Sequence, residues 1–175
     1  MNINLEKAIE LLNQGEVIGV PTDTVYGLAS LKSGVSKIYE IKERPKDKKI
    51  VKMVDSINKL TVKDEELKKL MCNEWPGATT IIFEINGSME SYRIPKEDNI
   101  LSLLKLLSED LYVTSANISG EKDIVSRVEF NNQFPLVKLL EEKVECSKTN
   151  APSKIYSPTG NEISADISPF KLVGS

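Results

Sequence analysis

Basic side chains are concentrated between residues 42 and 52. This segment holds six basic and two acidic residues, a local charge of +4, although the whole chain has a net charge of -3. Lys42 and Arg44 stand where a helical pattern meets Pro45, which biases the residue before it away from helical geometry. A guanidinium binds phosphate or carboxylate as a planar fork, and a lysine adds a movable charge. Lys42 and Arg44 are therefore candidate anion-binding residues, whereas lysines such as Lys49 are individually expected to be solvated.

Two runs of small polar residues follow apolar stretches of strand length. PTDTVYGL, residues 21–28, comes after the apolar residues 17–20, and TSANISG, residues 114–120, follows a strand pattern at 111–114. At the end of a strand, hydroxyl and amide groups are well placed to bind a small polar ligand or phosphate oxygens. The same residue types also form ordinary turns, and composition alone favours a turn for the first run.

Three further features are weaker by themselves. Arg93 follows an alternating strand pattern and is either an edge charge or an anchor for a carboxylate. Trp75 precedes a proline and a glycine, and its indole is expected to pack in the core. The segment 152–154, Pro-Ser-Lys, carries little information alone.

The composition removes several kinds of chemistry. The 175 residues include no histidine, so Ser-His, Cys-His and His-metal arrangements are excluded. Cys72 and Cys146 form no CxxC pair, which argues against a zinc cluster and a disulfide framework and fits a reducing cytoplasm. Neither a GxxxxGK[ST] loop nor a GxGxxG motif occurs, so ATP, if bound, is held in another way. With no apolar run of membrane-spanning length, we expect a cytoplasmic protein without membrane contact.

The polar and apolar pattern predicts the elements that position these residues. Asn4 and Asp64 are candidate helix N-caps, and Asn86-Gly87 is a strong signal for a tight hairpin turn. Helices and strands together indicate one α/β domain over residues 1–175, with a sheet of mixed direction. Further helices are predicted at 35–42, 100–107 and 135–142, and strands at 17–20, 50–54, 79–85, 89–94, 111–114, 143–146, 153–156, 162–165 and 170–173.

Five motifs, taken in order, closely resemble the YrdC/Sua5/TsaC family. Each motif is weak alone, but five in register are specific. The chain looks like the short, single-domain form, because it lacks the extra C-terminal domain of longer members. The motifs are PTDTVYGL (21–28), KERP (42–45), WPGATT (75–80), YRIP (92–95) and TSANISG (114–120), and APSKIYSPTG (151–160) is similar to a later family segment.

The resemblance implies both a fold and a reaction. The fold is a twisted mixed parallel and antiparallel sheet with flanking helices and a concave basic cavity. The activity is that of a nucleotidyltransferase, L-threonylcarbamoyladenylate synthase, which forms threonylcarbamoyl-AMP and pyrophosphate from L-threonine, bicarbonate or CO2, and ATP. Downstream tRNA threonylcarbamoyltransferase proteins then modify adenosine 37 of tRNA (t6A), and a transient tRNA contact is a further expectation.

The resemblance also assigns roles to individual residues. Lys42 and Arg44 are the expected catalytic residues, because with Lys48 they would neutralise charge on the leaving pyrophosphate. Mg2+ is expected through the ATP phosphates, with no side-chain metal ligands. The matching positions are Thr24, Arg93 and Ser153 on the threonine side, and Arg44, Lys48, Ser115 and Asn117 on the ATP side.

The chain departs from the family pattern at three places. Met53 stands where some members have a histidine, and Lys154 replaces a usual threonine. The closing residues 170–175, FKLVGS, lack the arginine of a typical LLRPG ending, although Lys171 could substitute for it. These departures bear on how the end of the chain contacts the adenylate.

Two other functions fit the same residues. A basic concave surface could hold tRNA or double-stranded RNA and assist translation or ribosome maturation without catalysis, although a net charge of -3 argues against strong nonspecific RNA binding. A carbamoyl-adenylate enzyme with a substrate other than threonine is the second alternative. Dependence of pyrophosphate release on threonine and bicarbonate separates all three.

Overall fold

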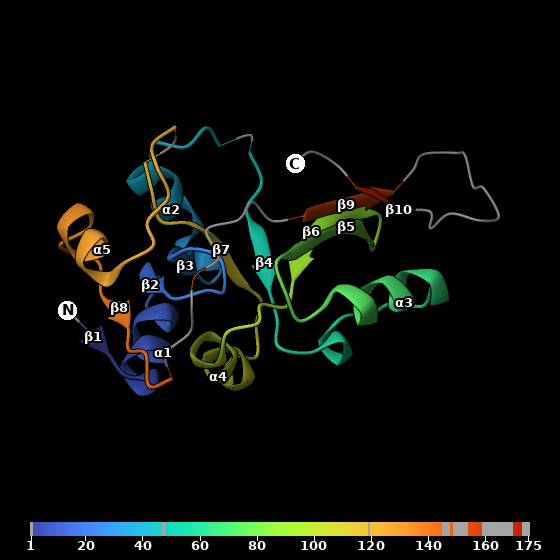
Figure 1. Cartoon of the computed structure of the whole chain (residues 1–175), viewed down its shortest axis with the longest axis horizontal. Helices are drawn as coiled ribbons and strands as arrows, with labels where there is room; N and C mark the ends of the chain where they lie inside the picture. The colour runs from blue at the N-terminus through green and yellow to red at the C-terminus, as the bar shows by residue number, and fades with distance from the viewer. Residues whose placement is uncertain are drawn as a thin grey trace.

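The computed structural model describes residues 2–46, 48–118, 120–144, 148 and 154–158, and the backbone of 170–172. In these residues one mixed sheet runs through the molecule, with helices packed on its faces (Figure 1). The strands follow the order β1-β8-β2-β3-β7-β4-β6-β5-β9-β10. They are β1 Asn2–Ile3, β2 Ile18–Val20, β3 Gly27–Ser30, β4 Val51–Met53, β5 Thr79–Ile85, β6 Ser88–Arg93, β7 Leu111–Ser115, β8 Leu139–Leu140, β9 Lys154–Pro158 and β10 Phe170–Leu172.

Local signals account for most of the helix boundaries. The Asn4 side chain accepts a hydrogen bond from the Lys7 amide, and Asp64 accepts from two amides of the first turn that follows it, so both predicted N-caps are confirmed. The helices are α1 Leu5–Asn13, α2 Val35–Lys42, α3 Glu65–Glu74, α4 Asp98–Leu106 and α5 Arg127–Gln133, with short 3-10 turns η1 Lys32–Gly34 and η2 Ile57–Lys59.

The central strands bring distant segments together. β3 lies antiparallel to β7, with Gly27 opposite Ser115, and β7 lies antiparallel to β4. β4 pairs with β6 in parallel, with Met53 opposite Arg93. The hairpin of β5 and β6 turns at Asn86 and Gly87, both at positive φ, as the sequence predicts.

Around β3 both faces of the sheet are covered by helices, and consecutive strand residues point to opposite faces. On β3, Ala29 packs with α1 and α4, whereas Leu28 packs with α2 and α5. α3 covers the hairpin, where Trp75 lies in a separate buried cluster with Phe83. Figure 1 shows α3 beside β5 and β6, and the other helices around β2, β3 and β7. No helix in the described part of the chain is long and apolar enough to cross a membrane.

The predicted helix at 135–142 is wrong. The helix lies earlier, in α5, and Leu139 and Leu140 form β8 between β1 and β2. A short apolar run has no periodicity that separates a buried strand from a helix, and here parallel pairing with β1 and β2 decides. Residues 143 and 144 are not in a strand; the other predicted strand at 162–165 lies outside the described residues.

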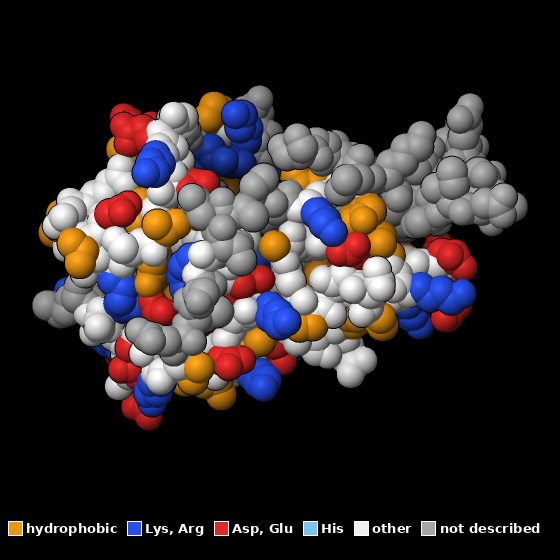
Figure 2. Space-filling view, viewed as in Figure 1, with side chains coloured by type: hydrophobic (Ala, Val, Ile, Leu, Met, Phe, Trp, Pro, Cys, Tyr) orange, Lys and Arg blue, Asp and Glu red, His pale blue; other side chains and the backbone are white. Residues whose placement is uncertain are grey.

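Charged side chains of both signs cover the face of the molecule that Figure 2 shows. Lys and Arg residues there are interspersed with Asp and Glu residues, and no continuous basic surface is visible on this face. Within residues 42–52, Arg44 and Lys49 line a cavity.

Candidate functional site

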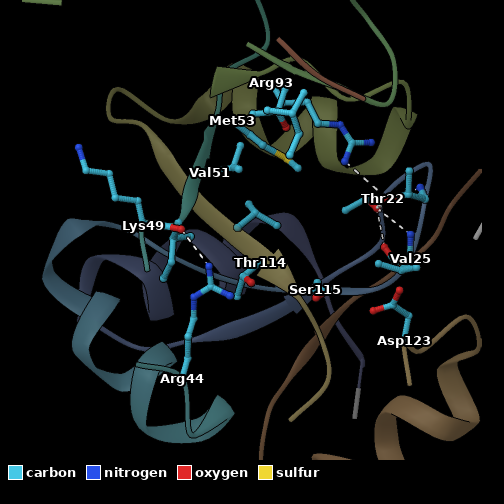
Figure 3. A pocket seen from close by; sticks show the side chains of 16 residues that line it. Thr22, Val25, Arg44, Lys49, Val51, Met53, Arg93, Thr114, Ser115 and Asp123 are labelled. Atoms are coloured by element: carbon cyan, nitrogen blue, oxygen red, sulfur yellow. Dashed lines mark hydrogen bonds between the residues drawn. The ribbon is translucent and has the colours of Figure 1, made fainter. Parts of the chain in front are cut away.

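A cavity of about 270 Å³ opens where β3, β4, β6 and β7 meet the loops that follow β2 and α2. Figure 3 shows Arg44 on one side of the cavity, and Arg93 and Thr22 on the other. Ser115 lies between Arg44 and Asp123. The lining residues are Thr22, Thr24, Val25, Gly27, Arg44, Lys49, Ile50, Val51, Met53, Thr80, Arg93, Val113, Thr114, Ser115, Asp123 and Ile155.

Backbone pairing places the two polar runs of the sequence side by side. The Ala116 amide donates to the Tyr26 carbonyl at 2.8 Å, and the Tyr26 amide donates to the Ile124 carbonyl at 2.9 Å. The first bond continues the pairing of β3 with β7 beyond the strand ends, and the second ties residue 124 to the same loop. Thr24 and Ser115, although far apart in sequence, therefore reach the same cavity.

The end of α2 directs Arg44 toward the cavity. The helix stops at Lys42 because Glu43 adopts a left-handed conformation with φ 54°, and the Arg44 amide bonds back to the Tyr39 carbonyl at 3.0 Å. The Arg44 Nη2 donates to the Lys49 carbonyl at 3.0 Å, whereas its buried Nε has no hydrogen-bond partner among the described residues. This arrangement leaves donors of the guanidinium for an anion.

Lys42 lies behind the cavity wall and does not line it. Its side chain is buried, and the ammonium donates to the Ser115 carbonyl at 2.7 Å and to the Thr114 Oγ1 at 3.1 Å. The Ser115 Oγ and the Asn117 Oδ1 complete its surroundings, each at 3.3 Å. Burial, together with the positive charge of Arg44, lowers the pKa of Lys42 to about 8, against a weaker opposing effect of Asp123.

Arg93 is held by a buried carboxylate that sequence reasoning missed. Its guanidinium pairs with Asp23, and its Nε donates to the Gly77 carbonyl at 3.0 Å. Nη1 lies 3.5 Å from the Thr24 Oγ1, so the group reaches the threonine hydroxyl at the cavity. Burial lowers the pKa of Arg93, and the charge of Asp23 and its hydrogen bond oppose that effect. A guanidinium is protonated in proteins at neutral pH.

The loop after β2 is a turn and also part of the cavity wall. The Thr22 Oγ1 accepts hydrogen bonds from the amides of Thr24 and Val25, each at 3.2 Å. Thr22 and Thr24 are both buried and both line the cavity. The two interpretations of this segment, turn and ligand loop, therefore do not exclude each other.

A match to a family model covers most of the chain. The Sua5/YciO/YrdC model, described as telomere recombination, matches residues 10–165. The chain belongs to this family. The expected fold, a mixed sheet with flanking helices, is confirmed with it.

Relatives of this Sua5/YciO/YrdC chain differ in length. The threonylcarbamoyl-AMP synthase of Bacillus subtilis is 33% identical over 135 residues, which cover 67% of this chain and 39% of the relative. The Escherichia coli K12 protein of the same name is 27% identical over 165 residues, covering 78% of this chain and 87% of the relative. Sua5 of P. abyssi, solved with L-threonine, has a TM-score of 0.81 at 23% identity and covers 92% of this chain and 55% of its own. The chain thus spans well under two thirds of the first and third of these proteins.

The structure brings together four of the residues that the family motifs single out. Thr24, Arg44, Arg93 and Ser115 line the cavity. Their roles toward a ligand, like those of the other matched residues, stay predictions.

Of the other matched residues, three are described and do not line the cavity, and the fourth lies outside the described residues. Lys42 and Asn117 are buried behind Ser115. Lys48 is exposed, and its carbonyl accepts a hydrogen bond from the Tyr39 hydroxyl. Ser153 lies outside the described residues.

Three charged residues at the site were not predicted from the sequence. Lys49 lines the cavity and donates to the Met89 carbonyl at 2.8 Å, although its sequence context reads as solvated loop. Asp123 lines the cavity too, and Asp23 holds Arg93. Asp23 lies inside the motif PTDTVYGL, so the motif itself was a usable signal; no pattern in the sequence singled out Asp123.

Proposed function

We propose that this chain synthesises threonylcarbamoyl-AMP from L-threonine, CO2 derived from bicarbonate, and ATP, as a nucleotidyltransferase. The observation that carries the proposal is the meeting of Thr24, Arg44, Arg93 and Ser115 in one cavity, from four separate motifs. The names of the relatives from B. subtilis and E. coli, and the L-threonine complex of the P. abyssi protein, support the substrate class.

The chemistry requires no nucleophile from the protein. The amine of threonine adds to CO2 and loses a proton, which gives a carbamate. A carbamate oxygen attacks the α-phosphorus of ATP, the bond to the bridging oxygen breaks, and pyrophosphate leaves with the bond electrons. The main task of the protein is to hold two anions close together and to stabilise the leaving charge.

The cationic side chains divide this task by position. Arg44, with free guanidinium donors at the cavity, is placed to bind phosphate oxygens. Arg93 retains donors beyond those given to Asp23 and Gly77, and these suit the carboxylate of an amino acid. Thr24 lies beside Arg93 and adds a hydroxyl to the same end of the cavity.

Mg2+ is proposed to enter with ATP. Asp123 is the one acidic side chain among the lining residues described, and no group of three or more potential ligand side chains gathers in the described part of the chain. Such a wall fits a Mg2+ ion held by substrate phosphates and water better than one held by the protein. When bound, the ion would neutralise charge on the phosphates.

The product is proposed to pass to downstream tRNA threonylcarbamoyltransferase proteins for t6A formation, with tRNA itself meeting the chain only transiently. A mixed anhydride of a carbamate and a phosphate is a reactive species, so a carrier or acceptor protein has to act on it soon after release. The name shared by the relatives supports the product and not these later partners.

Pyrophosphate release tests the proposal. The protein is incubated with ATP, Mg2+, bicarbonate and single amino acids. Release that depends on both threonine and bicarbonate is expected. Release with another amino acid instead would favour a different carbamoyl-adenylate enzyme, and ATP-independent RNA binding without any release would contradict the proposal.

Arg44→Ala is the variant that tests the phosphate end of the cavity. Removing one preorganised charge contact costs about 2–4 kcal/mol, so pyrophosphate release should fall roughly 30- to 1000-fold. Ser88→Ala changes an exposed residue at the start of β6 that does not line the cavity; it is the control and should keep the normal rate. Near-normal release by a folded Arg44→Ala variant would refute the role of Arg44.

A further inference from the structure

The hydroxyl of Ser115 lies between a group that only donates hydrogen bonds and a group that only accepts them. On one side is the Lys42 ammonium at 3.3 Å, which has no lone pair to accept with. On the other side is the Asn117 Oδ1 at 2.7 Å. Ser115 itself lines the cavity, while Lys42 and Asn117 are buried behind it.

The orientation of the Asn117 amide is fixed by its other contacts. Its Nδ2 faces two backbone carbonyls, of Glu121 at 2.7 Å and of Ile118 at 3.3 Å. A flipped amide would place its oxygen against both carbonyls and its NH2 group against the Lys42 ammonium. Oδ1 is therefore the atom that faces Ser115, and it can only accept.

These contacts settle the direction of the Ser115 hydrogen bonds. The single hydroxyl proton goes to Asn117. The three protons of Lys42 face four oxygens, of which the Ser115 carbonyl and the Thr114 Oγ1 are nearer, so the Ser115 Oγ shares the third proton with the Asn117 Oδ1. At least one lone pair of the hydroxyl therefore remains for the cavity. A phosphate oxygen, which offers only lone pairs, has no favourable contact with a hydroxyl in this state.

We infer that Ser115 acts in the cavity as a hydrogen-bond acceptor for an O–H or N–H group of the ligand, and that Lys42 and Asn117 are positioning residues that hold it in this state. The inference deepens the proposed function, and rests on it for the choice of ligands: the donor belongs to a ribose hydroxyl of the nucleotide or to the hydroxyl of the amino acid. Ser115 is thereby distinguished from Arg44, which is left to bind the phosphates.

The free protein gives a test that needs no ligand. With serine labelled at 13Cβ, a hydroxyl proton held by Asn117 exchanges slowly, so Ser115 should show two Cβ signals in an equal mixture of H2O and D2O at pH 7. With a pKa of about 8, Lys42 is mostly protonated there. Asn117→Ala should merge the two signals. A single averaged signal in the unmodified protein would overturn the inference.

Binding measured by calorimetry, without turnover, identifies the donor. The probes are ATP against 2′-deoxy-ATP and 3′-deoxy-ATP, L-threonine against L-2-aminobutyrate, and inorganic pyrophosphate. In one arm the unmodified protein should prefer the ligand with the hydroxyl by about 3- to 10-fold, as expected for one neutral hydrogen bond, and Ser115→Ala should abolish that preference. The arm that responds names the source of the donor.

Pyrophosphate separates an acceptor from a phosphate-binding donor. Ser115→Ala should leave pyrophosphate affinity within about twofold. Asn117→Ala, which frees the hydroxyl to rotate, should remove the hydroxyl preference and keep or raise pyrophosphate affinity, a pattern that general damage to the fold would not produce. Loss of pyrophosphate affinity in Ser115→Ala, or no effect in either hydroxyl arm, would overturn the inference. Failure of threonine-dependent turnover would count against the proposed function alone, because none of these readouts requires it.

Discussion

At the scale of single residues, the buried carboxylate of Asp23 fixes the position of the Arg93 guanidinium. Arg93 is 5% exposed and Asp23 is 9% exposed, so each would be a costly unpaired charge without the other. Asp23 also accepts from the Lys96 amide at 3.2 Å, which fixes the carboxylate independently of Arg93. The guanidinium is thus oriented before any ligand arrives.

Asp23→Asn tests this pair. The substitution keeps the shape of the side chain but leaves the buried guanidinium without a counter-charge, so the free energy of unfolding should fall by about 3–5 kcal/mol. Urea denaturation measures the change. The double variant Asp23→Asn/Arg93→Met, which removes both charges, should lose less than the single variant; a loss under about 1 kcal/mol in Asp23→Asn would show that the pair is not needed for stability.

At the scale of elements, β2 and β8 pack closely against α5. Gly19, in the middle of β2, faces the ring of Phe130 from α5 and lies beside Leu139 of β8. A Cβ at position 19 would clash with the Phe130 ring and would stand 2.9 Å from the Leu139 Cδ1. Phe130 is fully buried, so it has little room to move away.

Gly19→Ala should therefore destabilise the protein by about 1–3 kcal/mol through overpacking. Thermal or urea unfolding provides the measurement. Gly19→Ala/Phe130→Leu should cost less than the sum of the two single variants, because the smaller side chain makes room for the methyl group. Strict additivity would mean that the two positions do not meet in the folded state.

At the scale of the whole molecule, a small net negative charge contrasts with a cavity lined mainly by cationic side chains. The chain has a net charge of -3, and the face in Figure 2 mixes both signs. Inside the cavity, by contrast, the described charged side chains are Arg44, Lys49 and Arg93 against Asp123. Such a distribution favours a small anionic ligand over a long polyanion.

RNA binding should consequently be weak and only mildly dependent on salt. Between 50 and 200 mM salt we expect the affinity for double-stranded RNA or tRNA to fall less than about tenfold, whereas six to ten phosphate contacts would give about 10³- to 10⁵-fold. Fluorescence anisotropy with labelled RNA measures this. A steep salt dependence at sub-micromolar affinity would favour the RNA-binding alternative.

Much of the fold followed from local patterns that carry their own physical cause. Asn4 and Asp64 each satisfy free amides at a helix start, and Asn86-Gly87 adopts the positive φ values that a tight hairpin requires. β8 was not predicted, because its two leucines form a strand only by pairing with β1 on one side and β2 on the other. That pairing is a long-range contact, which no local pattern contains.

The sequence by itself determined which side chains are available: it contains no histidine, and Thr24, Arg44, Arg93 and Ser115 stand in motifs of specific order. Only the tertiary structure decided which of them meet and in what state. Pairing of β3 with β7 brings Thr24 and Ser115 together, and burial turns Lys42 inward to hold Ser115. Contacts between residues far apart in the chain, and the burial that they create, arise only when the sheet forms. They therefore cannot be predicted from any single segment.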